Sequence, residues 1–290
     1  MIRIGIVGAE NSHSIAISKI LNIEKRIAGC RAVAIWGETD AFAARAAEAG
    51  QIPTIVKRPA DMLGQIDAAI VDHRHAKYHL AAAEPFLKAK LPLFIDKPFC
   101  YRLAAGKAFL ARARRMKVPV TSFSTIPTHR SFAAFQKAVA KAGPAAAVAS
   151  VGSCDLQSPY GGIFFYGIHQ VDALLSLCGP DVRAVCVTRA AGGKDAVATL
   201  FWKGGLVGSM HCIASRRVGF QLAAATDTGP VSTALTGDPS PYLTGVKTFT
   251  RMFKTGKEPF SHKAILARVA VLEAMEKSVR TGKVTPVAKV

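Results

Sequence analysis

Acidic residues, paired cysteines and long hydrophobic runs are all scarce in this sequence. It holds 19 Asp and Glu against 38 Lys and Arg, a formal net charge of +19. No hydrophobic run reaches the roughly 18 residues that a membrane-spanning helix needs, and Met1 leads directly into the strand-like IRIGIV without a basic leader. These absences predict a soluble, cytoplasmic protein that makes no membrane contact.

The six cysteines are scattered, with no C-x-x-C pair. This spacing argues against disulfides and predicts reduced, mostly buried thiols. The sequence contains no internal repeat and no low-complexity linker. With 290 residues, half of them hydrophobic, the chain is globular and long enough for two ordinary domains.

The excess of basic residues is concentrated between Lys88 and Lys117, where nine basic residues accompany a single acid, Asp96. Such a segment fits a solvated basic face, an anionic substrate, a phosphorylated cofactor or nucleic acid. No helix-turn-helix, zinc or RNA-binding motif accompanies the charge. The sequence therefore predicts a small-molecule substrate and no nucleic-acid partner.

The hydrophobic pattern predicts an α/β protein of two domains. Over residues 1–121, continuous apolar strands alternate with amphipathic helices, which is typical of a doubly wound parallel sheet. Residues 122–290 carry longer β-like segments around one embedded helix, which indicates an open, largely antiparallel sheet. The elements expected there are strands 145–152, 182–189, 197–202, 205–213, 220–225 and 246–249, helices 164–177 and 262–281, and a surface loop at 226–241.

The segment PLFIDKPF, residues 92–99, carries the strongest functional signal. It reads as a buried strand that ends at Asp96 and Lys97, and open α/β sheets bind ligands at the carboxyl ends of their strands. Pro98 disfavours helical backbone at Lys97, so we expect that lysine in an extended turn.

The first strand-to-helix turn, GIVGAENSHS, is a degenerate dinucleotide-binding turn. Gly8 remains, but Glu10 and His13 occupy the two later glycine places of G-x-G-x-x-G. Asn11 and Ser12 can cap the helix and donate hydrogen bonds, whether or not a cofactor binds.

The second strand ends in Trp36-Gly37, with no acid at the usual place for ribose binding, although Glu38 lies close by. Trp36 can stack on adenine or pack in the core. Because an acid there would repel a 2′-phosphate, its absence predicts that NADP is at least tolerated.

A second unusual segment, GGIFFYGIHQVD, places His169 and Asp172 three residues apart at an expected helix start. A helix N-terminus disfavours imidazolium and would keep His169 neutral. Asp172 could orient the imidazole or bind a substrate hydroxyl. The alternative interpretation is ordinary polar packing at a capped helix. Together with Lys97, the segment predicts an active site made from two domains.

In this order and spacing, these motifs resemble the Gfo/Idh/MocA oxidoreductases, the glucose-fructose oxidoreductase and inositol dehydrogenase family. FIDKP stands where the family has E-K-P, and GGIFFYGIHQVD stands where it has G-G-x-x-x-D-x-G-x-H-x-x-D. The resemblance implies an N-terminal Rossmann domain and a C-terminal α/β domain whose open sheet joins copies into a homodimer or homotetramer. It also implies hydride transfer between NAD or NADP and a sugar-like substrate.

By this resemblance Lys97 and His169 are the catalytic pair, with Asp172 and Tyr166 beside them. Asp96 stands for the glutamate next to the nicotinamide ribose. We expect the cofactor to be bound by the turn, the second strand and the Lys97 segment. The residues concerned are Gly8, Glu10, Asn11, Ser12, His13, Trp36, Asp96 and Lys97.

Some positions depart from the family pattern. Phe165 replaces an acid that commonly contacts the substrate, which favours a drier pocket and an anionic substrate received by Lys97 and Arg74. His73, His75 and His79 lack a Cys or acid at ligand spacing, so no metal site is predicted. The alternative function is a catalytically altered member that binds a nucleotide or sugar as a regulator or scaffold. A redox-neutral relative that uses NAD transiently lies between the two.

Overall fold

The computed structural model describes residues 1–236 and 240–290. Contacts along the chain divide these residues into two compact units. Unit 1 contains residues 1–123 and 240–265, and unit 2 contains residues 124–236 and 266–290. The sequence analysis assigned residues 240–265 to the second domain, but the structure places them in the first unit.

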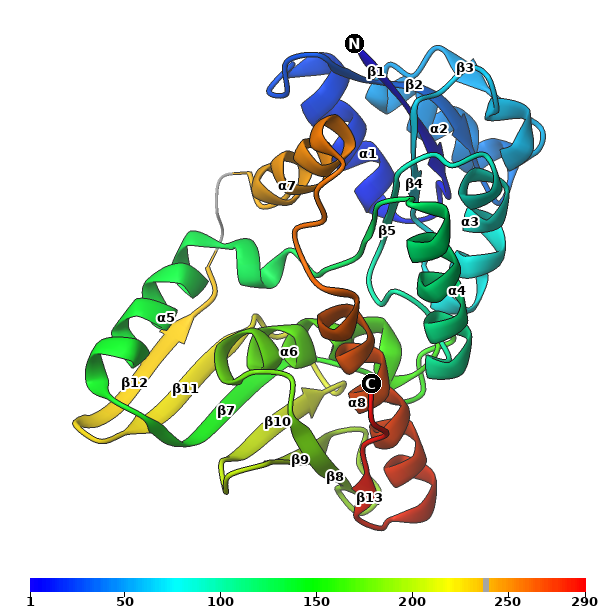
Figure 1. Cartoon of the computed structure of the whole chain (residues 1–290). Helices are drawn as coiled ribbons and strands as arrows, with labels where there is room; N and C mark the ends of the chain where they lie inside the picture. The colour runs from blue at the N-terminus through cyan, green and yellow to red at the C-terminus, as the bar shows by residue number, and fades with distance from the viewer. Residues whose placement is uncertain (237–239) are drawn as a thin grey trace. The chain divides into compact units, whose positions relative to one another are not determined.

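Unit 1 is built on a six-stranded parallel sheet in the order β3-β2-β1-β4-β5-β6 (Figure 1). Its strands are β1 (Ile2–Val7), β2 (Cys30–Trp36), β3 (Thr54–Ile55), β4 (Ala68–Val71), β5 (Leu93–Ile95) and β6 (Val120–Thr121). The register pairs Val7 with Trp36 and Val71, and Val71 with Ile95. Four strands therefore end level with one another, and the residues that follow them gather at one edge of the sheet.

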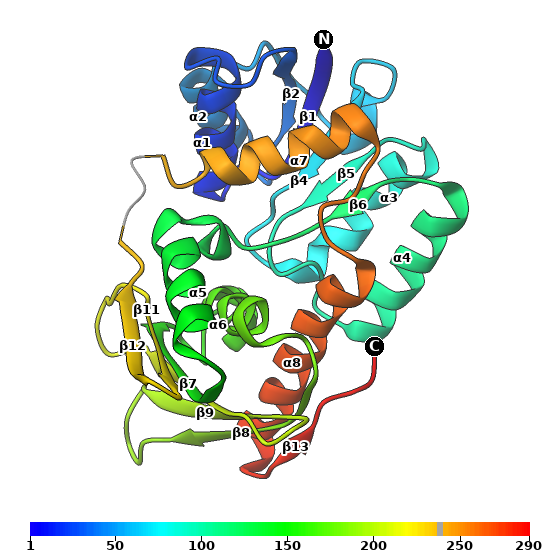
Figure 2. The same ribbon diagram turned by 60° about the vertical axis from the view of Figure 1, so that its left-hand side comes forward.

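Helices lie on both faces of this sheet (Figure 2). They are α1 (Ser12–Ser18), which continues as a π-helical turn (Lys19–Ile23), α2 (Asp40–Gly50), α3 (His79–Lys88), α4 (Leu103–Met116) and α7 (Leu243–Thr255). One buried cluster joins Ile4 and Ile6 of β1, Ile17 of α1, and Val246 and Phe249 of α7. This arrangement is the predicted doubly wound fold, which is confirmed.

The strand predicted at 246–249 is wrong, because these residues belong to α7. Val246, Phe249, Met252 and Phe253 are buried at helical spacing. The ring of Phe249 stacks on Phe94 of β5 at 4.4 Å. The pairing with Phe94 joins residues 155 positions apart, which no local pattern reveals.

Unit 2 contains a mixed, mostly antiparallel sheet of seven strands in the order β12-β11-β7-β10-β9-β8-β13. The strands are β7 (Ala145–Ser153), β8 (Val182–Arg189), β9 (Ala196–Trp202), β10 (Val207–Ile213), β11 (Gln221–Thr226), β12 (Gly229–Ala234) and β13 (Thr285–Pro286). β7 and β10 pair in parallel, and the other pairs are antiparallel. The predicted open, largely antiparallel sheet is confirmed.

The helices of unit 2 are α5 (Arg130–Ala142), α6 (Ile163–Cys178) and α8 (His262–Thr281), whose first turn belongs to unit 1. They lie on one face of the sheet (Figures 1 and 2). The sequence analysis did not anticipate α5, which buries Phe132, Phe135 and Val139 at helical spacing. The loop predicted at 226–241 is wrong over β12, and its residues 237–239 lie outside the described residues. Among the described residues, no helix combines the length and apolar character needed to cross a membrane.

Candidate functional site

The turn between β1 and α1 holds a glycine that no other residue can replace without strain. Gly8 has a φ of 112°, and a Cβ built on it would lie 2.7 Å from the carbonyl carbon of Asp72. The turn therefore packs directly against the end of β4. This is the close backbone approach expected of the first glycine in a dinucleotide-binding turn.

Glu38, which the sequence analysis noted but did not count among the cofactor-binding residues, reaches this turn. The Oε2 atom of Glu38 accepts hydrogen bonds from the backbone amides of Ala9 and Glu10, both at 2.9 Å. Its Oε1 atom is buried, and among the described residues it has no hydrogen-bond partner. Glu38 lies two residues beyond β2, and the register of β1 with β2 brings it to the turn. The acid missing after Trp36 is thus supplied one position further along.

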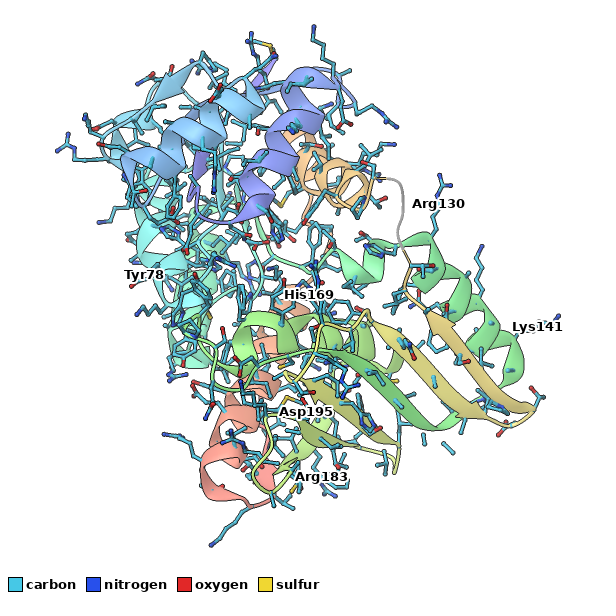
Figure 3. The ribbon with its side chains drawn as sticks, turned by 180° about the vertical axis from the view of Figure 1, so that it is seen from behind. Tyr78, Arg130, Lys141, His169, Arg183 and Asp195 are labelled. Atoms are coloured by element: carbon cyan, nitrogen blue, oxygen red, sulfur yellow. The ribbon has the colours of Figure 1, made fainter. Side chains whose placement is uncertain are left out.

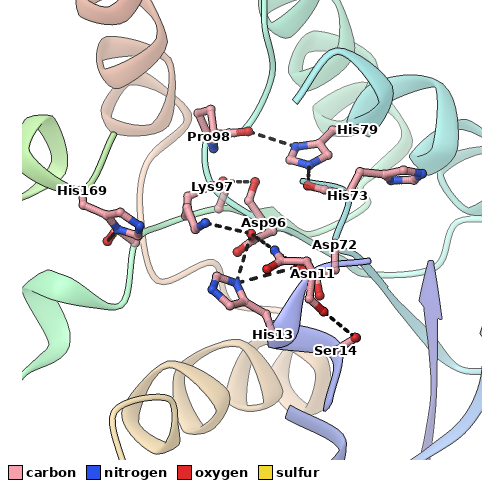
Figure 4. Close-up of polar contacts among 12 residues, drawn as sticks. Asn11, His13, Ser14, Asp72, His73, His79, Asp96, Lys97, Pro98 and His169 are labelled. Carbon is pink, nitrogen blue, oxygen red and sulfur yellow. Dashed lines mark hydrogen bonds and ion pairs between the residues drawn. The ribbon is translucent and has the colours of Figure 1, made fainter. Parts of the chain in front are cut away.

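Asn11 occupies the N-cap position of α1, but its side chain does not cap the helix. Instead its Nδ2 donates to Asp72 Oδ1 at 2.8 Å and to Asp96 Oδ2 at 3.3 Å (Figure 4). Carboxylates are stronger acceptors than uncharged groups, which explains the choice. The predicted capping by Asn11 is therefore wrong. Ser12, the first helical residue, is exposed.

A group of polar and charged residues, most of them buried, lies at the level ends of the strands, and we call it the strand-end cluster: Asn11, His13, Asp72, Asp96 and Lys97. His13 Nδ1 lies 3.2 Å from Asp96 Oδ2 and 3.8 Å from Asp72 Oδ1. Lys97 Nζ lies 3.5 Å from Asp96 Oδ2 (Figure 4). His13 occupies the position of the last glycine of G-x-G-x-x-G, and its imidazole points at the sheet edge.

The pKa values of the two carboxyl groups in the strand-end cluster are shifted in opposite directions. Burial raises the pKa of Asp72 well above its usual range, and the neighbouring charge of Asp96 raises it further. Burial also opposes ionisation of Asp96, but the charge of Lys97 and the contact with His13 lower the pKa of Asp96 below its usual range. Of the two carboxyl groups, Asp72 therefore holds a proton more strongly than Asp96.

Three members of the strand-end cluster offer atoms that could coordinate a metal ion. One atom each from His13, Asp72 and Asp96 lies within 4.8 Å of the others. Histidine nitrogen and carboxylate oxygen suit several divalent metals. The Lys97 ammonium already supplies positive charge beside Asp96. That no metal binds stays a prediction.

His79 holds the segment that carries Lys97, a role the sequence analysis did not assign. Its Nδ1 lies 3.0 Å from the carbonyl oxygen of Pro98 and its Nε2 lies 2.8 Å from that of His73. The ring is fully buried. It ties the turn after β5 to the turn after β4 (Figure 4), so the cis Lys97-Pro98 peptide is fixed at one place.

The remaining cofactor candidates of unit 1 have partners within the protein. Glu10 Oε1 lies 3.5 Å from Arg74 Nη1. The ring of Trp36 packs against His73 with centroids 5.7 Å apart, and its Nε1 donates to the carbonyl oxygen of Lys57 at 3.1 Å. Glu10 thus neutralises Arg74, the arginine from which the sequence analysis expected anion binding.

His169 lies in the second turn of α6 and not at its start. The helix begins at Ile163, directly after Gly161 and Gly162, both of which have positive φ. Because the helix dipole acts on its first turn, it does not reach His169, and the predicted dipole effect is wrong. His169, labelled in Figure 3, is 8% exposed. Its Nδ1 hydrogen-bonds with Ser124 Oγ at 2.7 Å.

Asp172 is a buried anchor of unit 2. Its Oδ2 accepts from the amide of Ser124 at 2.7 Å, and its Oδ1 accepts from Arg268 Nε at 2.7 Å and from Ser176 Oγ at 3.3 Å. Ser124, held in this way, in turn contacts His169. Asp172 therefore acts on the imidazole through Ser124.

The position of Phe165, where the family has an acid, belongs to an aromatic wall. Its ring lies 4.8 Å from that of Tyr166 and 4.9 Å from that of Tyr160. Tyr166 is 42% exposed, and its ring meets that of His169 at 5.5 Å. These rings line a pocket of about 710 Å³ within unit 2, together with Phe220 and further polar residues.

Residues 2–123 match the model of the Gfo/Idh/MocA family, described as an oxidoreductase family with an NAD-binding Rossmann fold. This match covers most of unit 1 and agrees with the resemblance drawn from the motifs. The sequence matches no curated protein.

Solved structures show the same fold along the whole chain. Scyllo-inositol dehydrogenase from Lactobacillus casei, solved with NAD(H) and scyllo-inositol, has a TM-score of 0.86 at 15% identity and full coverage of both chains. Myo-inositol 2-dehydrogenase from Lactobacillus plantarum has a TM-score of 0.86 at 15% identity, with 99% of each chain covered. An oxidoreductase from Agrobacterium radiobacter, solved with NAD+, L-tartaric acid and magnesium, has a TM-score of 0.80 at 15% identity, covering 99% of this chain and 98% of that one.

Proposed function

We propose that the protein is an NAD-dependent oxidoreductase that transfers hydride to or from a carbon bearing a hydroxyl group on a small, sugar-like substrate. The observation that carries the proposal is Glu38. Its carboxylate lies on the glycine turn of a Rossmann unit, with one buried oxygen lacking a donor among the described residues. In dinucleotide-binding folds, such an acid accepts a hydrogen bond from a ribose hydroxyl.

The cofactor would be held by the turn and the strand ends of unit 1. Gly8 allows close approach, Glu38 would accept a ribose hydroxyl, and Asp96 would lie towards the nicotinamide ribose. Ser12 is exposed at the start of α1, where a helix N-terminus favours a phosphate. When bound, the nicotinamide supplies or accepts the hydride.

Glu38 also changes the expected cofactor preference. The absence of an acid at Trp36-Gly37 favoured tolerance of NADP, but the Glu38 carboxylate occupies the turn in its place. A 2′-phosphate beside this carboxylate would meet like-charge repulsion. We therefore expect NAD to bind more tightly than NADP.

Lys97 and His169 are the proposed proton-handling residues. The contacts of Lys97 within unit 1 and those of His169 within unit 2 support these roles. Oxidation of an alcohol requires a base for the hydroxyl proton as hydride leaves, and reduction requires an acid. Lys97, whose Nζ lies 3.5 Å from Asp96 Oδ2, would polarise the reacting oxygen. His169 would accept and return the proton, with Ser124 and Asp172 holding its ring. Tyr166 would border the substrate.

Thermal unfolding with NAD, NADH, NADP and NADPH tests the cofactor assignment. A dinucleotide at a hundred times its dissociation constant raises stability by about 2.7 kcal/mol. We expect NAD or NADH to give the largest shift, and purified protein with hydroxyl-bearing substrates to reduce NAD. If no dinucleotide shifts the transition, the protein is instead the regulator or scaffold that binds another ligand.

We further propose that the open face of the unit 2 sheet pairs with a second copy of the chain. One row across this face, Ala147, Val207 and Phe201, is aligned by the strand register and carries no charge. Val207 is 40% exposed. Light scattering of the eluting protein should give a dimer or tetramer, and Val207→Glu should reduce its mass. A monomeric wild type would exclude this.

A further inference from the structure

The pocket of unit 2 carries two adjacent, exposed arginines. Arg216 and Arg217 follow β10 in the loop before β11, and both line the pocket. Arg216 lies near enough to Asp195 to help lower the pKa of that carboxyl, but both Asp195 oxygens already accept hydrogen bonds from Ala214 and Ser215. Asp155 is the single acid among the described lining residues. The pocket is therefore positive overall.

This loop is pinned at both of its ends, so the arginines are held over the pocket. At the β10 end, the Asp195 carboxylate accepts from the amides of Ala214 and Ser215, both at 2.8 Å, and from Ser215 Oγ at 2.7 Å. At the other end, Ser153 Oγ donates to the carbonyl oxygen of Val218 at 2.9 Å and accepts from its amide at 3.1 Å. A side chain on a fixed loop loses little backbone freedom when it binds a ligand.

The opposite wall is aromatic and reaches the proposed catalytic histidine. Tyr166 and Phe220 line the pocket, and each ring meets that of His169 edge-on with centroids 5.5 Å apart. The volume of about 710 Å³ is that of a small-molecule site. A molecule that fills it lies beside His169, with one end against the arginines.

We propose that this pocket takes the anionic end of the substrate, and that Arg216 and Arg217 are its specificity-determining residues. The substrate class is then a hydroxylated carbon chain ending in a carboxylate or a phosphate. The guanidinium fork matches the geometry of both groups. The inference deepens the proposed function and rests on it for the reaction at His169. It moves anion recognition from Arg74, which pairs with Glu10, to this loop.

Isothermal titration calorimetry of the full chain with three probes tests the proposal. D-gluconate carries the carboxylate, D-glucose 6-phosphate carries the phosphate, and D-sorbitol is the neutral control. We expect one or both anions to bind at least tenfold more tightly than sorbitol, and added salt to reduce the difference. The anion with the higher affinity shows whether the pocket prefers a carboxylate or a phosphate.

Arg216→Gln and Arg217→Gln should each weaken anion binding about tenfold and leave sorbitol binding unchanged. Arg183→Gln, on an exposed arginine of β8 (Figure 3), is the matched control and should change neither. Asp195→Ala, which releases one end of the loop, should weaken anion binding severalfold while the arginines remain.

Equal affinity for sorbitol and both anions, no anion binding at all, or arginine variants that bind anions like the wild type would each overturn the inference. These results leave the proposed function standing if neutral polyols still reduce NAD. Conversely, tight anion binding that needs both arginines, without turnover by any dinucleotide, upholds the pocket and refutes the oxidoreductase.

Discussion

The strand-end cluster of unit 1 and the arginine pocket of unit 2 treat charge in opposite ways. In the strand-end cluster, Asp96 has Lys97 at 3.5 Å and His13 at 3.2 Å, and all three lie almost out of solvent. In the pocket, Arg216 and Arg217 are exposed, and Asp155 is the single acid among the described lining residues. In the strand-end cluster the protein itself supplies the charges that face Asp96, whereas we expect a ligand to supply the negative charge that faces Arg216 and Arg217.

Because of this difference, substitutions in the two regions should have different effects on stability and on ligand binding. A buried charge that loses its partner must be desolvated without compensation, so substitutions in the strand-end cluster affect the fold and the chemistry together. An exposed arginine contributes little to stability, so its removal affects ligand binding alone. We expect stability within about 0.5 kcal/mol of wild type for Arg216→Gln and Arg217→Gln.

Lys97→Ala should have the largest effect on activity. Loss of a positioned acid or base lowers turnover by roughly a hundredfold or more, whereas NAD affinity should change little because the lysine acts on the reacting oxygen. Steady-state kinetics and NAD titration measure the two effects separately. Lys137→Ala on α5, an exposed lysine, is the control. A variant with wild-type kcat would remove Lys97 from the mechanism.

Asp172→Ala should have the largest effect on stability. The change takes the carboxylate from Arg268, whose side chain is only 12% exposed, and from the amide of Ser124. Loss of one partner from a buried ion pair costs about 3–5 kcal/mol. Urea unfolding measures it, and Asp172→Asn, which keeps acceptors in place, should lose less. A cost below about 1 kcal/mol would show that the network tolerates the gap.

The sequence predicts the strand ends of unit 1 well because their cause is local. A continuous apolar run such as residues 91–95 must be buried, so Asp96 and Lys97 could be expected at the strand-end edge, whereas Asp72 after β4 was not predicted. Helix α8 was predicted at its exact residues, since its buried positions repeat at helical spacing over 20 residues.

The features that the sequence did not predict depend on contacts between distant segments. Glu38 meets amides 28 and 29 residues away, through the register of two strands. In Val246-Lys247-Thr248-Phe249, β-branched and aromatic residues suggest a strand, and only packing against Phe94 makes this stretch one side of a helix. Arg216 and Arg217 are adjacent in the sequence. Their position in the pocket depends on the hydrogen bonds of Asp195 and Ser153 that hold the loop.

The histidines behind the strand-end cluster should make stability depend on pH. Burial lowers the pKa of His73 to about 4. Between pH 6.5 and 4 the unfolded chain therefore binds a proton that the folded chain does not, so stability falls as pH falls, by up to about 1.4 kcal/mol per pH unit. The raised pKa of Asp72 acts in the opposite direction in this range.

A variant separates the two groups. His73→Phe keeps a ring against Trp36 and Tyr78 and removes the titration. Urea unfolding at several pH values should show a smaller loss of stability on acidification than in the wild type. His211→Asn is the control, because His211 belongs to β10 of unit 2 and not to unit 1. Parallel pH curves for wild type and His73→Phe would show that His73 is protonated alike in both states.

Glu38→Gln should have the smallest effect and bears on whether the glycine turn is complete without a ligand. The amide keeps a hydrogen-bond acceptor but loses the charge that faces Ala9 and Glu10, so we expect NAD affinity to fall by about threefold to tenfold. Repulsion of a 2′-phosphate should fall as well, and the ratio of NADP to NAD affinity should rise. Fluorescence titration of NADH and NADPH measures both, with the exposed Glu24→Gln as the control. If the ratio stays the same, Glu38 only braces the turn and does not discriminate between NAD and NADP.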